Sequence, residues 1–342
     1  MTILVAGGAG YIGSHICKAL KGSGFTPVVL DNMSQGHPWA VKWGPFVQCA
    51  VQDTQKVQAA IAEYKPIAAI HLASSINARE SIVNLFSYYN NNVANSLKFF
   101  EVLCQMGVNH LVFSSSAAVY GHPEMLPLKE SHPKRPLHPY GKSKLMVEEI
   151  LQDLYLARGM ISASLRYFNA AGADPEGEIG EAHNPETHLI PLAIAAATGK
   201  GAPLRLNGDN FPTPDGTAIR DYIHVSDLAD AHVKALQKIL QEGKNLTLNL
   251  GTGKGYSVRQ ILVAVKDVVG REVPVLLGAR APEDPTALVA DPSRAKAALA
   301  WKPALSSIET IIESAYRWNM NLSADFGKFG QKNRNSAGNF MR

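Results

Sequence analysis

The amino-acid sequence predicts an α/β fold: a Rossmann-type doubly wound parallel sheet with a smaller α/β domain beside it. In the first half of the chain, short apolar runs alternate with helical patterns, which is typical of parallel βαβ units. The runs are almost continuously apolar, as expected of strands that helices cover on both faces. The predicted strands are residues 2–6, 27–31, 68–73, 110–115 and 162–167.

Predicted helices separate and follow these strands. Within residues 141–157, Met146, Ile150 and Leu154 recur at a spacing of four, which makes one apolar stripe on a helix. Two segments rich in glycine, proline and polar residues, 172–188 and 208–216, are predicted loops. The remaining predicted elements are helices at 12–23, 53–64, 85–106 and 227–241 and a strand at 247–250.

A change in composition and periodicity after Asn169 predicts two domains. Residues 1–170 form the first, and segments near 220–250 return to it. Residues 171–325 mainly form the second. Residues 326–342 are rich in glycine, asparagine and lysine with few apolar anchors, and we expect a flexible tail there.

The composition excludes several classes of protein. Hydrophobic residues make up 46% of the 342 residues and charged residues 18%, which supports a large core. The apolar runs end long before the roughly 20 residues of a membrane span, and no signal segment is recognisable, so we expect neither a membrane nor a secreted protein. The net charge of +4 is too small and too scattered for a nucleic-acid interface.

The cysteines and histidines predict a reducing compartment and no metal site. Cys17, Cys49 and Cys104 are isolated and form no Cys-x-x-Cys pair, which favours the cytoplasm. The eleven histidines show no His-x-x-x-His or Cys/His spacing of metal ligands.

A glycine-rich turn lies where the first strand becomes the first helix. Gly7, Gly10 and Gly13 permit a tight turn, a close approach of the backbone to a pyrophosphate, and packing of the helix on the strand. Asp31 ends the second strand 18 residues after Gly13. A carboxylate there accepts hydrogen bonds from ribose hydroxyls and repels a 2′-phosphate, so the pattern favours NAD over NADP.

A serine, a tyrosine and a lysine form a candidate catalytic group. Tyr140 and Lys144 are four residues apart at the start of a helix and therefore share one face. A nearby ammonium is expected to lower the pKa of the phenol from about 10, which would make Tyr140 a base for an alcohol proton while hydride leaves the carbon. Ser114 to Ser116 end the fourth strand, at the edge of the sheet where ligands bind.

These features resemble the extended short-chain dehydrogenase/reductase family and, within it, the UDP-glucose 4-epimerases. The Gly-x-x-Gly-x-x-Gly spacing is the variant of that family, and the resemblance runs from Ile3 to about Trp318. Its specific blocks are residues 7–15, 31–34, 88–93, 114–121, 139–147, 165–170 and 220–225.

The resemblance implies an isomerase that keeps NAD bound and inverts C4 of a UDP-hexose, from UDP-galactose to UDP-glucose, through a 4-keto form. Tyr140 would be the base, Ser116 would assist it, and Lys144 would complete the catalytic set. The first domain would hold NAD and the second the UDP-sugar. A homodimer would form through the helices near 85–106 and 141–157.

The resemblance also implies two sets of binding residues. The NAD set is Gly7, Gly10, Tyr11, Ile12, Gly13, Asp31, Asn32, Met33, Ser34, Leu72, Ala73, Ser74, Asn91, Ser114, Tyr140, Lys144 and Phe168. The UDP-sugar set is Ser116, Tyr140, Asn169, His188, Leu189, Arg205, Leu206, Asn207, Arg220, Tyr222, Arg280, Asp284 and Leu288.

Four positions depart from the family pattern. Ala50 replaces an aspartate that holds the adenine amino group, and Ala281 replaces an arginine that binds the UDP phosphates. His188 stands in place of an asparagine, and Leu288 in place of a bulky tyrosine near the sugar. The sugar itself therefore stays open among a hexose, an N-acetylhexosamine, a pentose and a uronate.

Two further hypotheses are a nucleotide-sugar dehydratase or decarboxylase of the same fold and, in a different class, a non-catalytic NAD-binding protein. A 4,6-dehydratase needs an acid/base pair directly after the strand-end hydroxyl, where this chain has Ala117 and Ala118, and this argues against elimination. A non-catalytic NAD-binding sensor would tend to lose Tyr140 or Lys144, and both are present.

Overall fold

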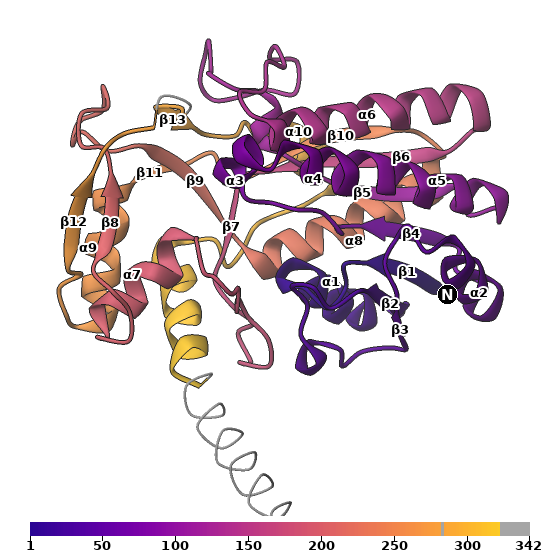
Figure 1. Cartoon of the computed structure of the whole chain (residues 1–342), viewed down its shortest axis with the longest axis horizontal. Helices are drawn as coiled ribbons and strands as arrows, with labels where there is room; N and C mark the ends of the chain where they lie inside the picture. Colours follow the sequence, from indigo (N-terminus) through magenta and orange to yellow (C-terminus); the bar gives the residue numbers. More distant parts are fainter. Residues whose placement is uncertain (282–283, 322–342) are drawn as a thin grey trace, which may run out of the picture.

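The computed structural model describes residues 1–281 and 284–321; the predicted tail at 326–342 and the last residues of the predicted second domain lie outside the described residues. The largest element is a seven-stranded sheet in the order β10-β6-β5-β4-β1-β2-β3, with every pair parallel, which confirms the predicted fold class (Figure 1). Its strands are β1 (Thr2–Ala6), β2 (Thr26–Asp31), β3 (Phe46–Gln48), β4 (Ala68–His71), β5 (His110–Ser116), β6 (Ile161–Tyr167) and β10 (Leu246–Leu250).

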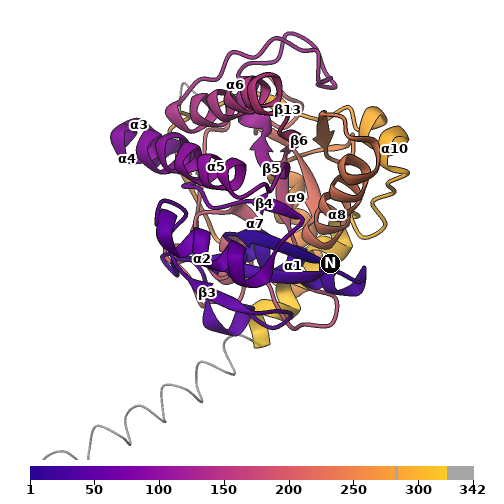
Figure 2. The same ribbon diagram turned by 90° about the vertical axis from the view of Figure 1, so that its right-hand side faces the viewer.

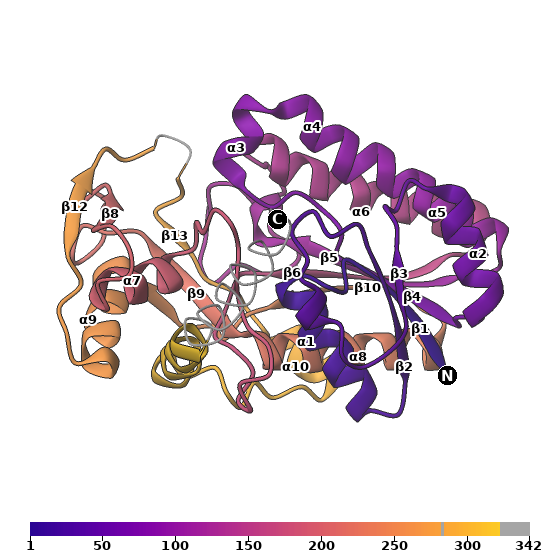
Figure 3. The same ribbon diagram turned by 60° about the horizontal axis from the view of Figure 1, so that its bottom comes forward.

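Helices cover both faces of this sheet. On one face lie α1 (Tyr11–Gly22) and α8 (Val225–Glu242), which pack against each other. The other face carries α2 (Thr54–Tyr64), α5 (Asn95–Gln105) and α6 (Pro139–Arg158), and the two layers are separated by the sheet in Figures 2 and 3. The strand order reverses beside β1, because β2 follows on one side and β4 on the other, and this opens a crevice at the carboxyl ends of the strands.

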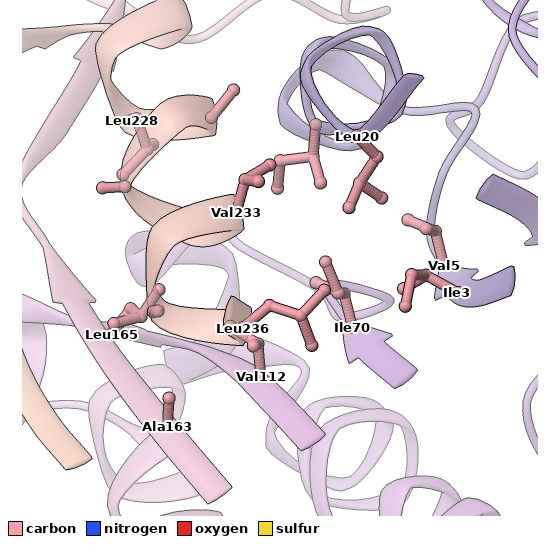
Figure 4. Packing of buried hydrophobic residues seen from close by; sticks show 14 of the residues in the cluster. Ile3, Val5, Leu20, Ile70, Val112, Ala163, Leu165, Leu228, Val233 and Leu236 are labelled. Carbon is pink, nitrogen blue, oxygen red and sulfur yellow. The ribbon is translucent and has the colours of Figure 1, made fainter. Parts of the chain in front are cut away.

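The alternation of side chains along β1 explains its continuous apolar run. Ile3 and Val5 point to the layer of α1 and α8, where they lie near Leu20, Val233 and Leu236 of those helices (Figure 4). Leu4 and Ala6 point to the opposite core. Successive residues of a strand face opposite sides, so a strand buried on both sides is apolar throughout.

The predicted helix at 85–106 is confirmed in its extent, but five residues in its middle are π-helical, and α3 precedes it. The structure has α3 (Ala78–Val83), α4 (Leu85–Tyr89), a π-helical segment at Asn90–Ala94, and then α5. Asn77 caps α3 by accepting a hydrogen bond from the backbone N–H of Glu80 at 3.0 Å. Asn84 leaves helical geometry between α3 and α4 (φ −109°, ψ 38°), directly before the predicted helix begins.

A second, smaller part lies beside the carboxyl ends of the large sheet (Figures 1 and 3). Its strands are short, and three of its helices share one apolar core. The elements are β7 (Asn169–Ala171), β9 (Ile219–His224), β11 (Gly255–Ser257) and β13 (Ala287–Leu288) in one sheet, β8 (Leu204–Asn207) and β12 (Val275–Gly278) in another, and the helices α7 (Leu189–Ala197), α9 (Val258–Val269) and 308–321.

The chain crosses between the two parts several times. It leaves the large sheet after β6, returns from β9 into α8, and leaves again after β10. It returns once more with α10 (Ser293–Leu299), which packs on α8 and β10, before the helix at 308–321. Single helical turns lie at Pro38–Ala40 and Ala117–Val119. Within residues 1–281 and 284–321, no helix has the length and apolar character to cross a membrane.

Candidate active site

A cleft of about 660 Å³ lies between the carboxyl ends of the large sheet and the second part. Its walls come from residues that follow β1, β2, β4, β5 and β6 and from the small sheet around β9 and β13. Of the residues predicted from the sequence, those that line the cleft are Gly7, Gly10, Tyr11, Ile12, Gly13, Asp31, Asn32, Ser34, Leu72, Ala73, Ser74, Asn91, Ser116, Tyr140, Phe168, Asn169, His188, Arg220, Asp284 and Leu288.

The other predicted residues lie behind the wall or away from it. Ser114 and Lys144 are buried directly behind it and contact each other. Arg280 stacks on the ring of Phe211, with its guanidinium carbon 4.0 Å from the ring centre. The remaining predicted residues do not line the cleft: Met33, Leu189, Arg205, Leu206, Asn207, Tyr222 and Arg280.

The glycine turn is shaped by protein contacts at two of its three positions. Gly7 has φ +83°, and a Cβ there would lie 2.8 Å from the backbone nitrogen of Ala73. A Cβ on Gly13 would lie 2.1 Å from the carbonyl oxygen of Gly7. At Gly10 the nearest atom is 3.5 Å away, so only a ligand close to the backbone would require glycine there. The free N–H groups at the start of α1 face this place, as in anion sites.

Asp31 is fixed at the edge of this turn. Its carboxylate accepts hydrogen bonds from the backbone N–H of Ala9 at 3.0 Å and from that of Met33 at 2.9 Å. These two bonds orient the carboxylate and leave each oxygen a further lone pair for a hydroxyl donor in the cleft. Met33 contributes through its backbone, which adopts the left-handed conformation (φ +63°).

The structure brings Ser116, Tyr140 and Lys144 together. His138 caps α6 by accepting a hydrogen bond from the N–H of Gly141 at 3.2 Å, and Pro139 occupies the first turn. Tyr140 and Lys144 then lie one turn apart, with the Lys144 nitrogen 5.9 Å from the centre of the Tyr140 ring. The phenol of Tyr140 shares a hydrogen bond with Ser116 at the end of β5.

The pKa of Tyr140 differs from the sequence-based expectation. Burial raises the pKa of this phenol, and the hydrogen bond with Ser116 lowers it only in part. The ammonium of Lys144 donates instead to the Ser74 hydroxyl at 2.9 Å and to the Ser114 carbonyl at 2.8 Å. Burial lowers the pKa of Lys144 to about 7, so at neutral pH its positive charge is only partly present. A phenolate at Tyr140 therefore needs additional positive charge from a bound molecule.

Asn92 holds the site together and was not found by sequence reasoning. Its side chain accepts from the N–H of Ser75 at 2.8 Å and donates to the Ser75 carbonyl at 3.0 Å and to the Ser143 hydroxyl at 3.1 Å. Asn92 thus ties the loop after β4 to α6, while the neighbouring Asn91 donates to the Ser75 hydroxyl at 3.1 Å. Both lie in the π-helical segment, a feature frequent at functional sites. The only sequence signal is three consecutive asparagines inside an apolar helical pattern.

Comparison with known proteins gives the family. The sequence pattern of the NAD dependent epimerase/dehydratase family matches residues 3–251. The chain belongs to this family. The match covers every strand of the large sheet, the glycine turn and the Ser116, Tyr140 and Lys144 group.

Individual family members align over almost the whole chain. The UDP-glucose 4-epimerase of Rhizobium meliloti (strain 1021) is 45% identical over 317 residues, which cover 93% of this chain and 96% of that protein. A crystal structure of UDP-glucose 4-epimerase from Brucella ovis in complex with NAD superposes with a TM-score of 0.91 at 45% identity, over 93% of this chain and 98% of that one. The enzyme of the same name from Bifidobacterium longum, in complex with NAD⁺ and UDP, gives 0.90 at 35% identity over 94% and 98%.

The departures from the family pattern fall at the cleft or close to it. Ala50 lines the cleft, so the wall lacks the carboxylate that an aspartate would place at this position. Ala281 is the last described residue before 282–283. Arg79 at the start of α3 also lines the cleft and pairs with Asp284 at 2.9 Å, which brings a second guanidinium to the same wall as Arg220. Arg79 was not singled out from the sequence because its partner is 205 residues away.

Proposed function

We propose that this family member is an NAD-dependent isomerase that interconverts UDP-galactose and UDP-glucose by inverting C4 of the sugar. The observation that carries the proposal is the Ser116, Tyr140 and Lys144 group at one end of a cleft whose other end holds the glycine turn and Asp31. The names of the relatives support the same reaction. In this proposal the large sheet with α8 holds NAD, and the second part mainly holds the UDP-sugar.

The residues present fit NAD. Gly10 has room for a pyrophosphate that no side chain fills, the start of α1 offers free N–H groups, and the Asp31 carboxylate keeps lone pairs for ribose hydroxyls. When bound, NAD supplies a reversible hydride acceptor for C4, and its oxidised ring supplies positive charge. That charge is what the buried Tyr140 lacks, because burial raises its pKa.

The chain itself handles the proton. Tyr140 takes the proton of the sugar 4-hydroxyl and returns it after the sugar has turned its other face to the cofactor. Ser116 holds the same oxygen through its hydroxyl, and the protonated fraction of Lys144 adds to the positive charge that favours the phenolate. Arg220 and Arg79 line the cleft where they can bind diphosphate oxygens as planar guanidinium groups.

Replacement of the phenol tests the proposal. The variant Tyr140→Phe keeps the ring but loses the hydroxyl, so we expect NAD binding to persist and turnover to fall by about 10²-fold or more. Proton NMR of UDP-galactose mixed with each protein measures the turnover, and cofactor fluorescence measures the binding. Tyr155→Phe, on the exposed side of the same helix, is the matched control and should behave as the parent. Full activity of Tyr140→Phe would refute Tyr140 as the base.

The same assay identifies the sugar. Leu288 lines the cleft from β13, and the proposal expects UDP-galactose to turn over faster than UDP-N-acetylgalactosamine, a pentose or a uronate. A faster reaction with one of these would reassign the substrate but keep the chemistry. Tightly bound NAD without turnover of any of them would favour the sensor hypothesis.

We also propose a homodimer through the outer helices of the large-sheet layer. Exposed apolar side chains gather on α3 to α6, which lie together along one side of the molecule (Figures 1 and 2). They include Val83, Phe86 and Leu156, with 77%, 79% and 73% of their surfaces exposed. Light scattering should give a dimer for the parent and a monomer for Phe86→Glu. Leu276→Glu, an exposed apolar residue of the second part, should stay dimeric.

The three cysteines support a cytoplasmic location, which we propose with the function. Cys17, Cys49 and Cys104 are free thiols. A reducing compartment keeps such thiols unpaired.

A further inference from the structure

Two histidines and two glutamates meet in the loop that precedes α7. One ligand atom from each of Glu181, His183, Glu186 and His188 lies within 4.8 Å of the other three. The His188 Nδ1 is 2.7 Å from a Glu181 oxygen and 3.0 Å from a Glu186 oxygen, and the His183 Nδ1 is 2.9 Å from the same Glu181 oxygen. Both rings therefore present the same nitrogen to one shared centre.

We propose that Glu181, His183, Glu186 and His188 bind a divalent transition-metal ion. Imidazole nitrogen together with carboxylate oxygen is a donor set that suits Zn²⁺ and its first-row neighbours, and four such donors satisfy a tetrahedral ion. The proposal goes beyond the isomerase function and does not depend on it. It differs from the expectation of no metal site, which rested on the absence of regular histidine spacings.

The charge of the cluster supports a divalent ion. The two carboxylates are mostly buried, with 6% and 20% of the Glu181 and Glu186 side chains exposed, so their two negative charges need compensation. Two protons on the imidazoles supply it, because each protonated ring donates a hydrogen bond to a carboxylate, His183 to Glu181 at 2.9 Å and His188 to Glu186 at 3.0 Å. One divalent ion supplies the same charge.

The distance between the rings favours the single ion. The centres of the His183 and His188 rings are only 5.1 Å apart, so two imidazolium charges repel each other. A divalent ion between two neutral imidazoles removes this repulsion and still balances the two negative charges of the glutamates. The neighbouring acidic cluster differs, because Asp174, Glu176 and Glu178 surround the ammonium of Lys18 at 2.6–2.8 Å and thus already hold a cation. We infer no metal site there.

The proposed site is supported from both parts of the molecule and is open to solvent. Its backbone is held by the Trp318 indole, which donates to the Glu181 carbonyl at 2.8 Å, and by a hydrogen bond between the His37 ring and the Ala182 carbonyl at 2.7 Å. Glu181, His183 and His188 also line the cleft, which gives an ion a route of entry. The loop that carries the donors is thus held in place before an ion arrives, which favours binding.

Direct titration of the metal tests the proposal. The full chain, purified without a histidine tag and treated with EDTA, is titrated with ZnCl₂ by calorimetry, with MgCl₂ as a comparison ion that prefers oxygen ligands. We expect one Zn²⁺ per chain and no comparable Mg²⁺ binding. Two imidazole protons must leave, so the heat should depend on the buffer's ionisation enthalpy and the affinity should rise from pH 7 to pH 9.

Matched variants assign the binding to these residues. The double variant His183→Gln/His188→Gln should lose the stoichiometric binding, and Glu186→Gln, which keeps the side-chain shape, should weaken it at least tenfold. His122→Gln, an exposed histidine elsewhere, and Glu176→Gln, in the Lys18 cluster, should bind as the parent does. Circular dichroism checks that each variant is folded. Absence of stoichiometric Zn²⁺ binding by the parent, or unchanged binding by the folded double variant, would overturn the proposal.

Discussion

Replacement of Lys144 by methionine should make the protein more stable while it impairs the reaction. Lys144 is 2% exposed, and its ammonium contacts only two protein oxygens among the described hydrogen bonds. Burial lowers its pKa to about 7, which means that the fold disfavours the charged form. Methionine has a similar length and no charge, so Lys144→Met removes the free-energy cost of burying a charged lysine.

The size of the effect follows from the pKa. A fall from 10.5 to about 7 corresponds to about 5 kcal/mol against the charged form, at about 1.4 kcal/mol per tenfold change. Loss of the bonds to Ser74 and Ser114 offsets this by about 1–3 kcal/mol. The net gain in the free energy of unfolding at pH 7 is therefore about 2–4 kcal/mol.

The difference in stability between Lys144→Met and the parent depends on pH. The unfolded lysine is charged below 10.5, whereas the folded one loses its proton near 7, so the penalty is complete below pH 7. It declines as the pH rises from 7 to 10.5 and is absent above that. The advantage of methionine should accordingly be largest at pH 7 and should disappear near pH 10, where only the lost hydrogen bonds remain.

Guanidinium unfolding of both proteins at pH 7 and pH 10 measures the difference, with NAD removed from each because a ligand of the folded state would add its own stabilisation. Lys142→Met, at an exposed position on the same helix, is the control and should change little at either pH. A Lys144→Met protein that is less stable than the parent at pH 7, or a difference that does not change with pH, would refute the reasoning.

Three further predictions concern the turn, the cofactor and the histidine cluster. Gly13→Ala should lower the free energy of unfolding by about 3 kcal/mol, because the new Cβ would lie 2.1 Å from the Gly7 carbonyl oxygen; Gly22→Ala, with no atom within 4 Å, should not, and equal stabilities in denaturant would contradict this. Ala50→Asp should tighten NAD binding about tenfold if its carboxylate accepts from the adenine amino group, and an unchanged dissociation constant in a fluorescence titration would exclude that contact. For metal-free protein, the folded pKa values of His183 and His188 lie above their ordinary 6.5, so their stabilisation is complete below pH 6.5 and is lost as the pH rises to about 9–10. Thermal unfolding across this range should show the decline, and the double His→Gln variant should flatten it; an equally steep decline in that variant would count against the assignment.

The large sheet was predictable because each of its strands is recognisable from a local run of apolar residues. Strands buried on both faces are apolar along most of their length, as in β1 and in the first half of β5, and this pattern can be read without knowing which strands pair. The small sheets carry no such signal: β13 is two residues long and β11 three, too short for any period. The helix at 85–106 was predictable as well, since its apolar pattern continues from α4 through the π-helical segment into α5.

The site was predictable where its residues are neighbours in sequence. Tyr140 and Lys144 share a helix face by their spacing alone. The pairing of Arg79 with Asp284 joins segments 205 residues apart, so no local pattern contains it. The pKa of Tyr140 was misjudged because it depends on burial, which only the fold determines.

The repeated crossing of the chain between the two parts has a mechanical consequence. Two bodies joined by one strand can swing widely apart, but here the connections after β6, β9 and β10 are separate tethers. Relative motion is then restricted to a small rotation about the line of these tethers. A sugar that has to present its other face would turn over inside a chamber of nearly constant size, with its nucleotide end still anchored, instead of leaving and entering again.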